Sequence, residues 1–183
     1  MENIYFNPAD LKHLGENVII GKTVRIRHPE RVSIGDNCII DDFAYISTGL
    51  ELGKCCHISS NVTISGGEGN VKIGDYSTIS ANCSIHAGSS DYRIVSLDLP
   101  SVPEELRFGG ITEDIIVGNF VTIGAHSTML PGVKLPDGFA AGAYTLIKKR
   151  KYKPWTLYAG YHAVQLGKRD NTKLLQLMEE GKL

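Results

Sequence analysis

Apolar residues return about every six positions along most of this chain, and this period is its main structural signal. The period is clearest from Val117 to Ile147, where an apolar residue opens each successive group of six. A hexapeptide period is typical of a parallel β-helix, in which three hexads form one triangular coil. The apolar first position points into the prism, and the coils stack through parallel backbone hydrogen bonds. Glycine and asparagine suit the corners because both tolerate positive φ.

The repeat is interrupted in three places between its start at Leu14 and its end near Ile147. Short insertions at 27–31 and 66–70 shift its phase, and a long excursion over 86–116 separates two runs of hexads. An irregular segment of that length inside a compact domain is usually functional. About eighteen hexads make about six coils, which is enough for a repeat fold to be stable.

Both ends of the chain depart from the repeat. We expect a lead-in at 1–13, the β-helix at 14–150, and a return segment with a capping helix at 151–183. Apolar residues at helical spacing among charged neighbours predict an amphipathic helix between Lys168 and Leu183 that covers the open end of the prism. The chain is therefore expected to be one all-β domain with a short C-terminal helix.

Composition restricts the partners and the location. The chain has 19 Lys and Arg against 20 Asp and Glu, so its net charge of -1 gives no reason to expect a nucleic-acid partner. No apolar run approaches the roughly 18 residues of a membrane span. The first residues lack the layout of a signal peptide, which predicts a cytoplasmic protein. Cys38, Cys56 and Cys83 occupy the inward fifth position of their hexads and are expected to be reduced core residues, with Cys55 facing out.

Three segments carry a family resemblance: Ile123–Val133, Ala141–Lys149 and Pro154–Gly160. Together they resemble the C-terminal signature of the left-handed β-helix (hexapeptide-repeat) acyltransferases, including the sugar O- and N-acetyltransferases of polysaccharide biosynthesis. The resemblance implies a left-handed parallel β-helix, assembled as a homotrimer with active sites between the subunits. It also implies direct transfer from acetyl-CoA to a sugar hydroxyl or to a nucleotide-linked amino sugar, in surface polysaccharide or O-antigen biosynthesis.

Acyl transfer to such an acceptor requires a base, and histidine suits this role because it titrates near neutrality. Related sugar O-acetyltransferases carry their catalytic histidine a few residues into the excursion, where this chain has Ser89-Ser90-Asp91-Tyr92. Two hypotheses follow from this departure. Either His57 is the base, oriented by Asp91 of the same or a neighbouring subunit, or His86 is the base and Asp91 contacts the acceptor. The ordinary alternatives are a surface histidine at a corner for His57 and an Asx-turn for Asp91.

The remaining candidate residues divide into an acceptor set and a donor set. Tyr92, Asn61 and Ser90 are the candidate contacts to the acceptor. The phosphates of CoA need cations, which the basic tail supplies beside the last coil, although a charge run is ordinarily a solvated face. Small residues line the expected path of the pantetheine arm. The candidate donor contacts are Gly124, Ala125, Gly142, Ala143, Lys148, Lys149, Lys168 and Arg169.

Two other functions fit a β-helix of this kind. A γ-class carbonic anhydrase requires three histidines that converge on zinc, and His57, His86 and His126 are irregularly spaced for that purpose. A non-catalytic scaffold would bind no CoA, and the basic tail and the long excursion argue against it. An acetyltransferase that needs no metal is therefore the preferred prediction. The sequence leaves open whether the acceptor atom is oxygen or nitrogen.

Overall fold

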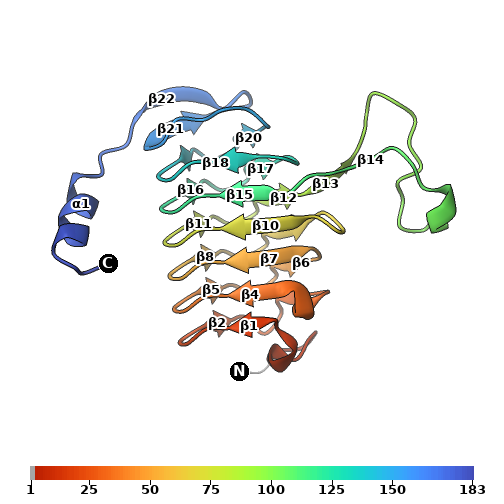
Figure 1. Ribbon diagram of the computed structural model, residues 1–183, viewed down its shortest axis with the longest axis horizontal. Helices are drawn as coiled ribbons and strands as arrows, with labels where there is room; N and C mark the ends of the chain where they lie inside the picture. Colours follow the sequence, from red (N-terminus) through yellow and green to blue (C-terminus); the bar gives the residue numbers. More distant parts are fainter. Residues whose placement is uncertain (1–2) are drawn as a thin grey trace.

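The computed structural model of this chain, which describes residues 3–183, is a triangular prism of stacked coils (Figure 1). Each coil contributes one short strand to each of three sheets, which we call faces A, B and C in chain order. Six coils are complete, and the chain then adds further strands to face B alone. The predicted fold class, an all-β left-handed parallel β-helix with an inserted loop and a short C-terminal helix, is confirmed.

The three faces are built almost entirely from parallel strands of two to four residues. Face A consists of β1 (His13–Leu14), β4 (Val32–Ile34), β7 (Gly49–Leu52), β10 (Asn70–Ile73), β15 (Ile115–Val117) and β18 (Lys134–Leu135). Face B consists of β2 (Ile19–Ile20), β5 (Ile39–Ile40), β8 (His57–Ile58), β11 (Thr78–Ile79), β16 (Thr122–Ile123), β19 (Ala140–Ala141), β21 (Thr156–Ala159) and the antiparallel β22 (Val164–Lys168). Face C consists of β3 (Arg25–Ile26), β6 (Tyr45–Ile46), β9 (Thr63–Ser65), β12 (Ser84–His86), β17 (Thr128–Met129) and β20 (Leu146–Ile147).

The apolar residue that opens each hexad belongs to a buried ladder inside its face. In face B, Ile20, Ile40, Ile58, Ile79 and Ile123 pair in register from coil to coil. Each of these side chains is at most 5% exposed. Burial of such a side chain contributes about 1.5–3 kcal/mol relative to exposure. The ladders therefore stabilise the prism, and the core predicted from the hexads is confirmed.

The cysteines also lie where the hexads predict. Cys38, Cys56 and Cys83 are buried, and all four cysteines are free thiols. Cys55 is only partly buried, at a corner with a φ of 55°.

Several corners carry bulky residues in place of the expected glycine or asparagine. Tyr76, Phe120 and Trp155 have φ values of 55°, 57° and 49° at the corner between faces A and B. The rings of Tyr76 and Phe120 stack with centroids 5.2 Å apart, and those of Phe120 and Trp155 lie 6.0 Å apart. Stacking between successive coils offsets the cost of a left-handed backbone at a large residue.

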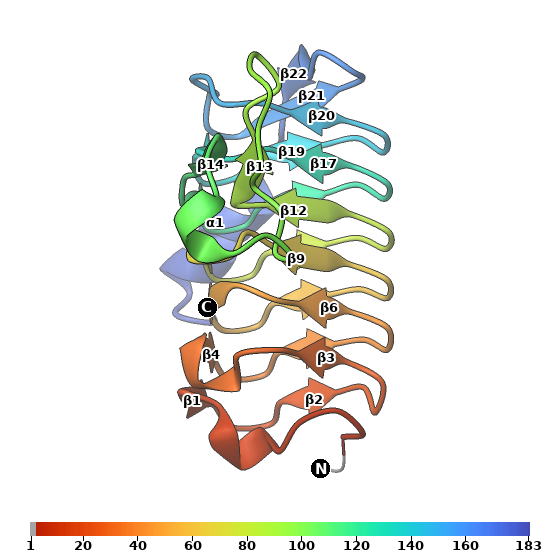
Figure 2. The same cartoon turned by 90° about the vertical axis from the view of Figure 1, so that its right-hand side faces the viewer.

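All three interruptions of the repeat fall at one corner, between faces C and A. The first contains the 3-10 helix η2 (Pro29–Arg31), and the second is the glycine-rich turn 66–69. The third, the excursion, is more ordered than predicted: β13 (Gly88–Ser90) pairs with β14 (Gly110–Thr112) as an antiparallel ribbon, and its outer loop contains η3 (Glu104–Leu106). This ribbon projects away from the prism in Figure 1, and Figure 2 views it from its outer side. The interruptions therefore build one continuous surface.

The C-terminal segment differs from the prediction in position. The helix α1 (Thr172–Glu179) is shorter than the predicted segment, has no buried residue, and lies beside the prism and away from its end (Figure 1). The rings of Tyr152 and Tyr158 instead pack against Phe139, with centroids 5.0 and 5.1 Å away, and fill the last coils. The amphipathic pattern thus predicted a helix correctly, but capping by this helix was wrong because aromatic side chains already occupy that end. No helix within residues 3–183 has the length and apolar character that crossing a membrane requires.

Candidate active site

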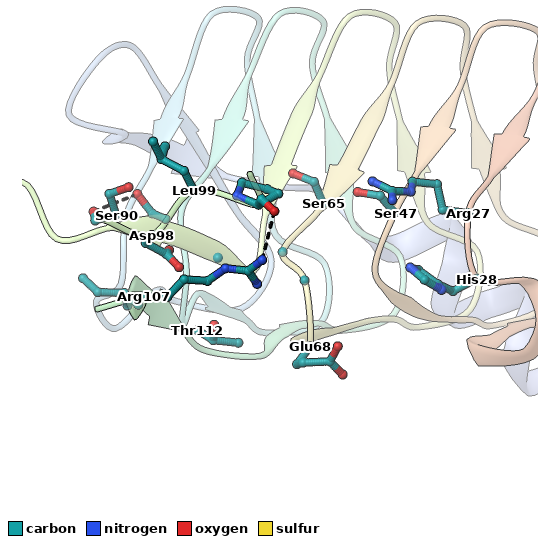
Figure 3. A pocket seen from close by; sticks show the side chains of 16 residues that line it. Arg27, His28, Ser47, Ser65, Glu68, Ser90, Asp98, Leu99, Arg107 and Thr112 are labelled. Atoms are coloured by element: carbon teal, nitrogen blue, oxygen red, sulfur yellow. Dashed lines mark hydrogen bonds between the residues drawn. The ribbon is translucent and has the colours of Figure 1, made fainter. Parts of the chain in front are cut away.

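A pocket of about 610 Å³ opens at the corner between faces C and A (Figure 3). Residues at the ends of face C strands form its floor, including Ser47 and Ser65, next to the glycine-rich turn. The β13–β14 ribbon forms one wall, and the loop residues 98–100 with Arg107 form another. This volume lies within the range of about 300–1,000 Å³ that is usual for small-molecule sites.

The glycine-rich turn that borders this pocket is held by two side chains. The Arg31 guanidinium donates hydrogen bonds to the carbonyls of Gly67, Glu68 and Gly69 and pairs with the Glu68 carboxylate at 3.1 Å. The Thr48 hydroxyl donates to the Gly67 carbonyl at 3.0 Å. A Cβ at position 66 would lie 2.6 Å from the Ala87 Cβ, so only glycine allows the turn to approach the start of the excursion this closely.

His86 ends β12 and lies behind the pocket lining, which it reaches through Ser65. Its Nδ1 shares a hydrogen bond of 2.9 Å with the hydroxyl of Ser65, which lines the pocket. Burial lowers the pKa of His86 because the charged imidazolium loses hydration. The lowered pKa favours the neutral ring at pH 7, which is the form that can accept a proton.

Asp91 follows the pocket-lining Ser90 directly in the chain. Its carboxylate accepts hydrogen bonds from Nε and Nη2 of Arg93, at 2.8 and 2.7 Å, and from the Arg93 backbone N–H at 3.0 Å. These bonds lower the pKa of Asp91 to about 2. The last of them closes the Asx-turn that was the ordinary alternative for this residue. A carboxylate that stays ionised is a poor base at neutral pH, but it suits an amine or ammonium group.

His57 lies on a different side of the prism. It is half-exposed on face B, and its Nε2 lies 2.7 Å from Asp41 Oδ2. Face B is opposite the corner that bears the pocket, so within one chain His57 contacts neither the pocket nor Asp91. The hypothesis that Asp91 orients His57 in the same subunit is therefore wrong, and its version across two subunits stays a prediction.

Sequence reasoning missed Asp41, although the hexad register contains a signal for it. His57 pairs with Ile39 in the neighbouring coil, and Asp41 follows two residues later in that coil, on the same side of the strand.

The three candidate acceptor contacts are not brought together. Ser90 lines the pocket. Tyr92 is not among the lining residues, and its side chain is 90% exposed. Asn61 lies at the corner between faces B and C. The structure instead adds lining residues that sequence reasoning did not single out. These are Arg27, Ser47, Ser65, Asp98 and Arg107.

The small residues predicted to contact the pantetheine arm do lie together. Gly124, Ala125, Gly142 and Ala143 occupy the corner between faces B and C on two adjacent coils. Within residues 3–183, the backbone N–H groups of Ala125 and Ala143 donate to no other group of the chain. Two amide donors without a partner in this range therefore lie at this corner, on neighbouring coils.

The predicted cations do not form one cluster. Lys148 lies 5.1 Å from the ring of Tyr161, Lys149 pairs with Glu113, and Lys168 is exposed on β22. Arg169 is committed elsewhere: its guanidinium donates to the carbonyls of Phe120, Gly138 and Phe139 at 2.9, 2.9 and 3.3 Å. These bonds indicate a structural role for Arg169, fastening the end of β22 to the prism.

We expect Arg169→Ala to lower the free energy of unfolding by about 1–3 kcal/mol, because three backbone carbonyls each lose a hydrogen bond from the guanidinium. Affinity for CoA should stay unchanged at temperatures where the variant is folded. Lys168→Ala is the matched control, and we expect the reverse result, with normal stability and weaker CoA binding. Thermal denaturation and calorimetric CoA titration measure both quantities. Loss of CoA affinity in Arg169→Ala without loss of stability would show that Arg169 contacts CoA after all.

Within residues 3–183 of one chain, no group of three or more His, Cys, Asp or Glu side chains is placed to hold a metal ion. His57, His86 and His126 lie on face B, on face C and at a corner, respectively. The described residues of a single chain therefore provide no zinc site of the kind that a carbonic anhydrase requires.

Comparisons with known proteins agree with this fold and extend it to activity. Residues 31–66 match the family described as bacterial transferase hexapeptide (six repeats). A dTDP-4-amino-4,6-dideoxy-D-glucose acyltransferase from Escherichia coli is 32% identical over 181 residues, covering 97% of this chain and 92% of that protein. A chloramphenicol acetyltransferase from Morganella morganii is 29% identical over 118 residues, covering 59% and 56%.

Among solved structures, AntD from Bacillus cereus superposes with a TM-score of 0.85 and 28% identity, covering 98% of this chain and 96% of that one. AntD is an N-acyltransferase, and that structure contains dTDP and 3-hydroxybutyryl-CoA. Together with the near full-length match to the Escherichia coli enzyme, these results show that the chain belongs to the hexapeptide-repeat acyltransferases.

Proposed function

We propose that this enzyme transfers an acyl group, most simply acetyl, from CoA to the amino group of a nucleotide-linked amino sugar. The observation that carries the proposal is the carboxylate of Asp91, at the Ser90–Asp91 position where the resemblance puts the catalytic histidine of the sugar O-acetyltransferases. Because its pKa is about 2, Asp91 remains an anion that can hold an amine. A hydroxyl acceptor needs a true base at this place, whereas a neutral amine is already nucleophilic. The dTDP-linked amino sugar named for the Escherichia coli relative has the same chemistry.

In the proposed reaction, Asp91 holds the amine by a hydrogen bond. The lone pair of the amine nitrogen attacks the carbonyl carbon of the thioester. The new C–N bond forms, the C–S bond breaks, and CoA leaves as a thiol after taking up a proton. His86 accepts the proton that the nitrogen loses and returns it to the departing sulfur, directly or through Ser65. Its neutral state and its bond to Ser65 support this role. His57 with Asp41 is the second candidate base, acting from a neighbouring subunit.

We propose that the acyl-CoA lies along the corner between faces B and C. The free N–H groups of Ala125 and Ala143 would then pair with carbonyls of the pantetheine arm, and Lys148, Lys149 and Lys168 would meet the phosphates. Face C lies between this corner and the acceptor pocket, so the two substrates would approach each other across it.

We propose that the protein is a homotrimer in which the excursion packs against a neighbouring subunit. Its apolar side chains are unusually exposed, with Tyr92 at 90%, Val95 at 86% and Phe108 at 52%. Exposed apolar surface of this extent usually marks an interaction site. Such packing would complete each active site with residues of two subunits.

The wild-type protein is therefore expected to sediment at the mass of three chains. Val95→Glu should weaken association by roughly tenfold or more, because it places a charge in the interface. Val164→Glu, which changes an exposed valine on β22, is the control and should leave the assembly intact. A monomeric wild type, or equal behaviour of the two variants, would contradict the trimer. Sedimentation velocity makes this measurement.

We place the reaction in the cytoplasm, where acyl-CoA and nucleotide-linked sugars are both available. An N-acylated sugar that remains linked to its nucleotide is activated for glycosyl transfer. We therefore propose that the product enters surface polysaccharide or O-antigen assembly.

Product analysis tests the proposed function. Acetyl-CoA and longer acyl-CoAs would be incubated with dTDP-, UDP- and GDP-linked amino sugars and with simple hydroxyl sugars. We expect a product whose mass increases by one acyl group, located on nitrogen by tandem mass spectrometry. Acylation of hydroxyl sugars alone would replace this proposal with O-acylation.

A further inference from the structure

Four residues form a ladder at the ends of the face C strands, and three of them, Arg27, Ser47 and Ser65, line the pocket. Ser65 pairs with His86 between neighbouring coils, and Ser47 and Arg27 follow Ile46 and Ile26 at the same position one and two coils further down. Rungs of a parallel sheet are about 4.8 Å apart, so three steps place Arg27 about 14 Å along the prism from His86. The pocket is therefore elongated, with the reacting groups near one end of the ladder and Arg27 at the other.

Positive charge gathers on this elongated pocket without a matching acid. Within residues 3–183, the Arg27 side chain forms neither an ion pair nor a hydrogen bond. The Arg107 guanidinium donates Nε to the Val102 carbonyl at 2.6 Å and Nη2 to the Pro100 carbonyl at 2.9 Å. Over the same described range its Nη1 stays free, and no carboxylate pairs with it. Figure 3 shows the two guanidinium groups extending toward each other over the floor formed by Ser47 and Ser65.

The acidic side chains near the pocket do not cancel this charge. Glu68 is paired with Arg31, and its side chain is 94% exposed. Asp98 lies beside Ser90 at the opposite end of the pocket from Arg27 (Figure 3). The pocket therefore has a carboxylate, Asp98, at its end near Ser90, and a cationic stretch toward Arg27. An occupant that carries an amine at one end and an anion further along would match this polarity.

We propose that Arg27 and Arg107 bind the diphosphate of the nucleotide-linked acceptor, with the amino sugar directed toward His86 and the nucleoside toward Arg27. This inference rests on the proposed function and assigns the orientation of its substrate. Guanidinium groups form strong charge-assisted hydrogen bonds with phosphate oxygens, and serine hydroxyls add neutral donors. A nucleoside without phosphate would gain nothing from either arginine.

Calorimetric titration of dTDP and thymidine tests this assignment. We expect Arg27→Gln to weaken dTDP binding by about 10- to 100-fold and to leave thymidine binding unchanged. Arg27→Lys should recover part of the loss. In kinetics, KM for the nucleotide-linked sugar should rise while KM for acyl-CoA and kcat change little.

Arg25→Gln is the matched control, because Arg25 lies two residues earlier on β3, packs near the rings of Tyr5 and Tyr45, and is outside the pocket lining. Equal dTDP binding by wild type and Arg27→Gln, or equal loss in the Arg25 variant, would overturn the assignment. A wild type that turns over nucleotide-linked amino sugars while Arg27→Gln behaves normally refutes only the diphosphate site. A wild type that neither binds dTDP nor acylates such a sugar refutes the proposed function as well.

Discussion

Asp91→Asn is expected to lower turnover of an amino-sugar acceptor by about 100-fold and to leave affinity for acyl-CoA unchanged. The neutral amide keeps the size of the side chain but loses the charge that holds the amine. Because the pKa of Asp91 is about 2, the wild-type carboxylate does not titrate between pH 5 and pH 9. Any acid limb of the activity in that range must therefore come from another group. Steady-state kinetics with separate variation of the two substrates makes the comparison.

Arg93→Gln separates the charge of Asp91 from its hydrogen bonds. Without Arg93, the pKa of Asp91 rises toward its usual value of 3.8, so the carboxylate is still ionised at pH 7. We expect this variant to keep most of its activity at pH 7. The stabilisation that comes with the depressed pKa is complete above about pH 4, and it is lost as pH falls toward 2. Full activity of Asp91→Asn, or equal damage by both substitutions, would show that the carboxylate does not hold the acceptor.

His86→Gln is expected to lower kcat by about 10²- to 10⁴-fold, the usual contribution of a general base. Burial lowers the pKa of His86 below its ordinary 6.5, so the wild-type ring loses its proton-accepting form only under more acidic conditions. Wild-type activity should therefore decline as pH falls below 6.5. In His86→Gln, the residual kcat should decline less steeply below pH 6.5, because the titration of His86 no longer contributes. A pH profile of kcat for both proteins is the measurement.

His57→Ala, measured beside His86→Gln, distinguishes the two candidate bases. If His57 and Asp41 of a neighbouring subunit supply the base, this variant loses most turnover with CoA affinity intact, and His86→Gln stays active. We expect the opposite ranking, with the larger loss in His86→Gln. The two histidines lie on different faces of one prism, so their effects identify which face of which subunit meets the acceptor.

The hexads predicted the core well because each inward position faces its equivalent in the next coil, so local sequence decides burial. Ile20, Ile40 and Ile58 illustrate this, since a period of six defines their ladder once the phase shifts are recognised. The helix α1 was predicted from its own amphipathic pattern. Its position depends instead on packing at the end of the prism, where the rings of Tyr152 and Tyr158 occupy the space that a capping helix would need.

The site was harder to predict because its contacts join residues from different coils and loops. Gly88–Ser90 has no apolar alternation, and its partner strand Gly110–Thr112 lies beyond a loop of 19 residues, from position 91 to position 109. The ladder of Arg27, Ser47 and Ser65 is periodic in space, but the insertion at 27–31 makes its first step longer in sequence than its second. A register corrected for that insertion would have placed the three residues in one column.

The most direct test of N-acylation compares two acceptors that differ in one functional group. Thiol release from acetyl-CoA would be followed with a dTDP-linked amino sugar and with the same nucleotide sugar carrying a hydroxyl in place of the amine. We expect rapid release with the amine and little or none with the hydroxyl, because Asp91 recognises the nitrogen. Equal release with both acceptors, or release with the hydroxyl alone, would contradict N-acylation as the function of this enzyme.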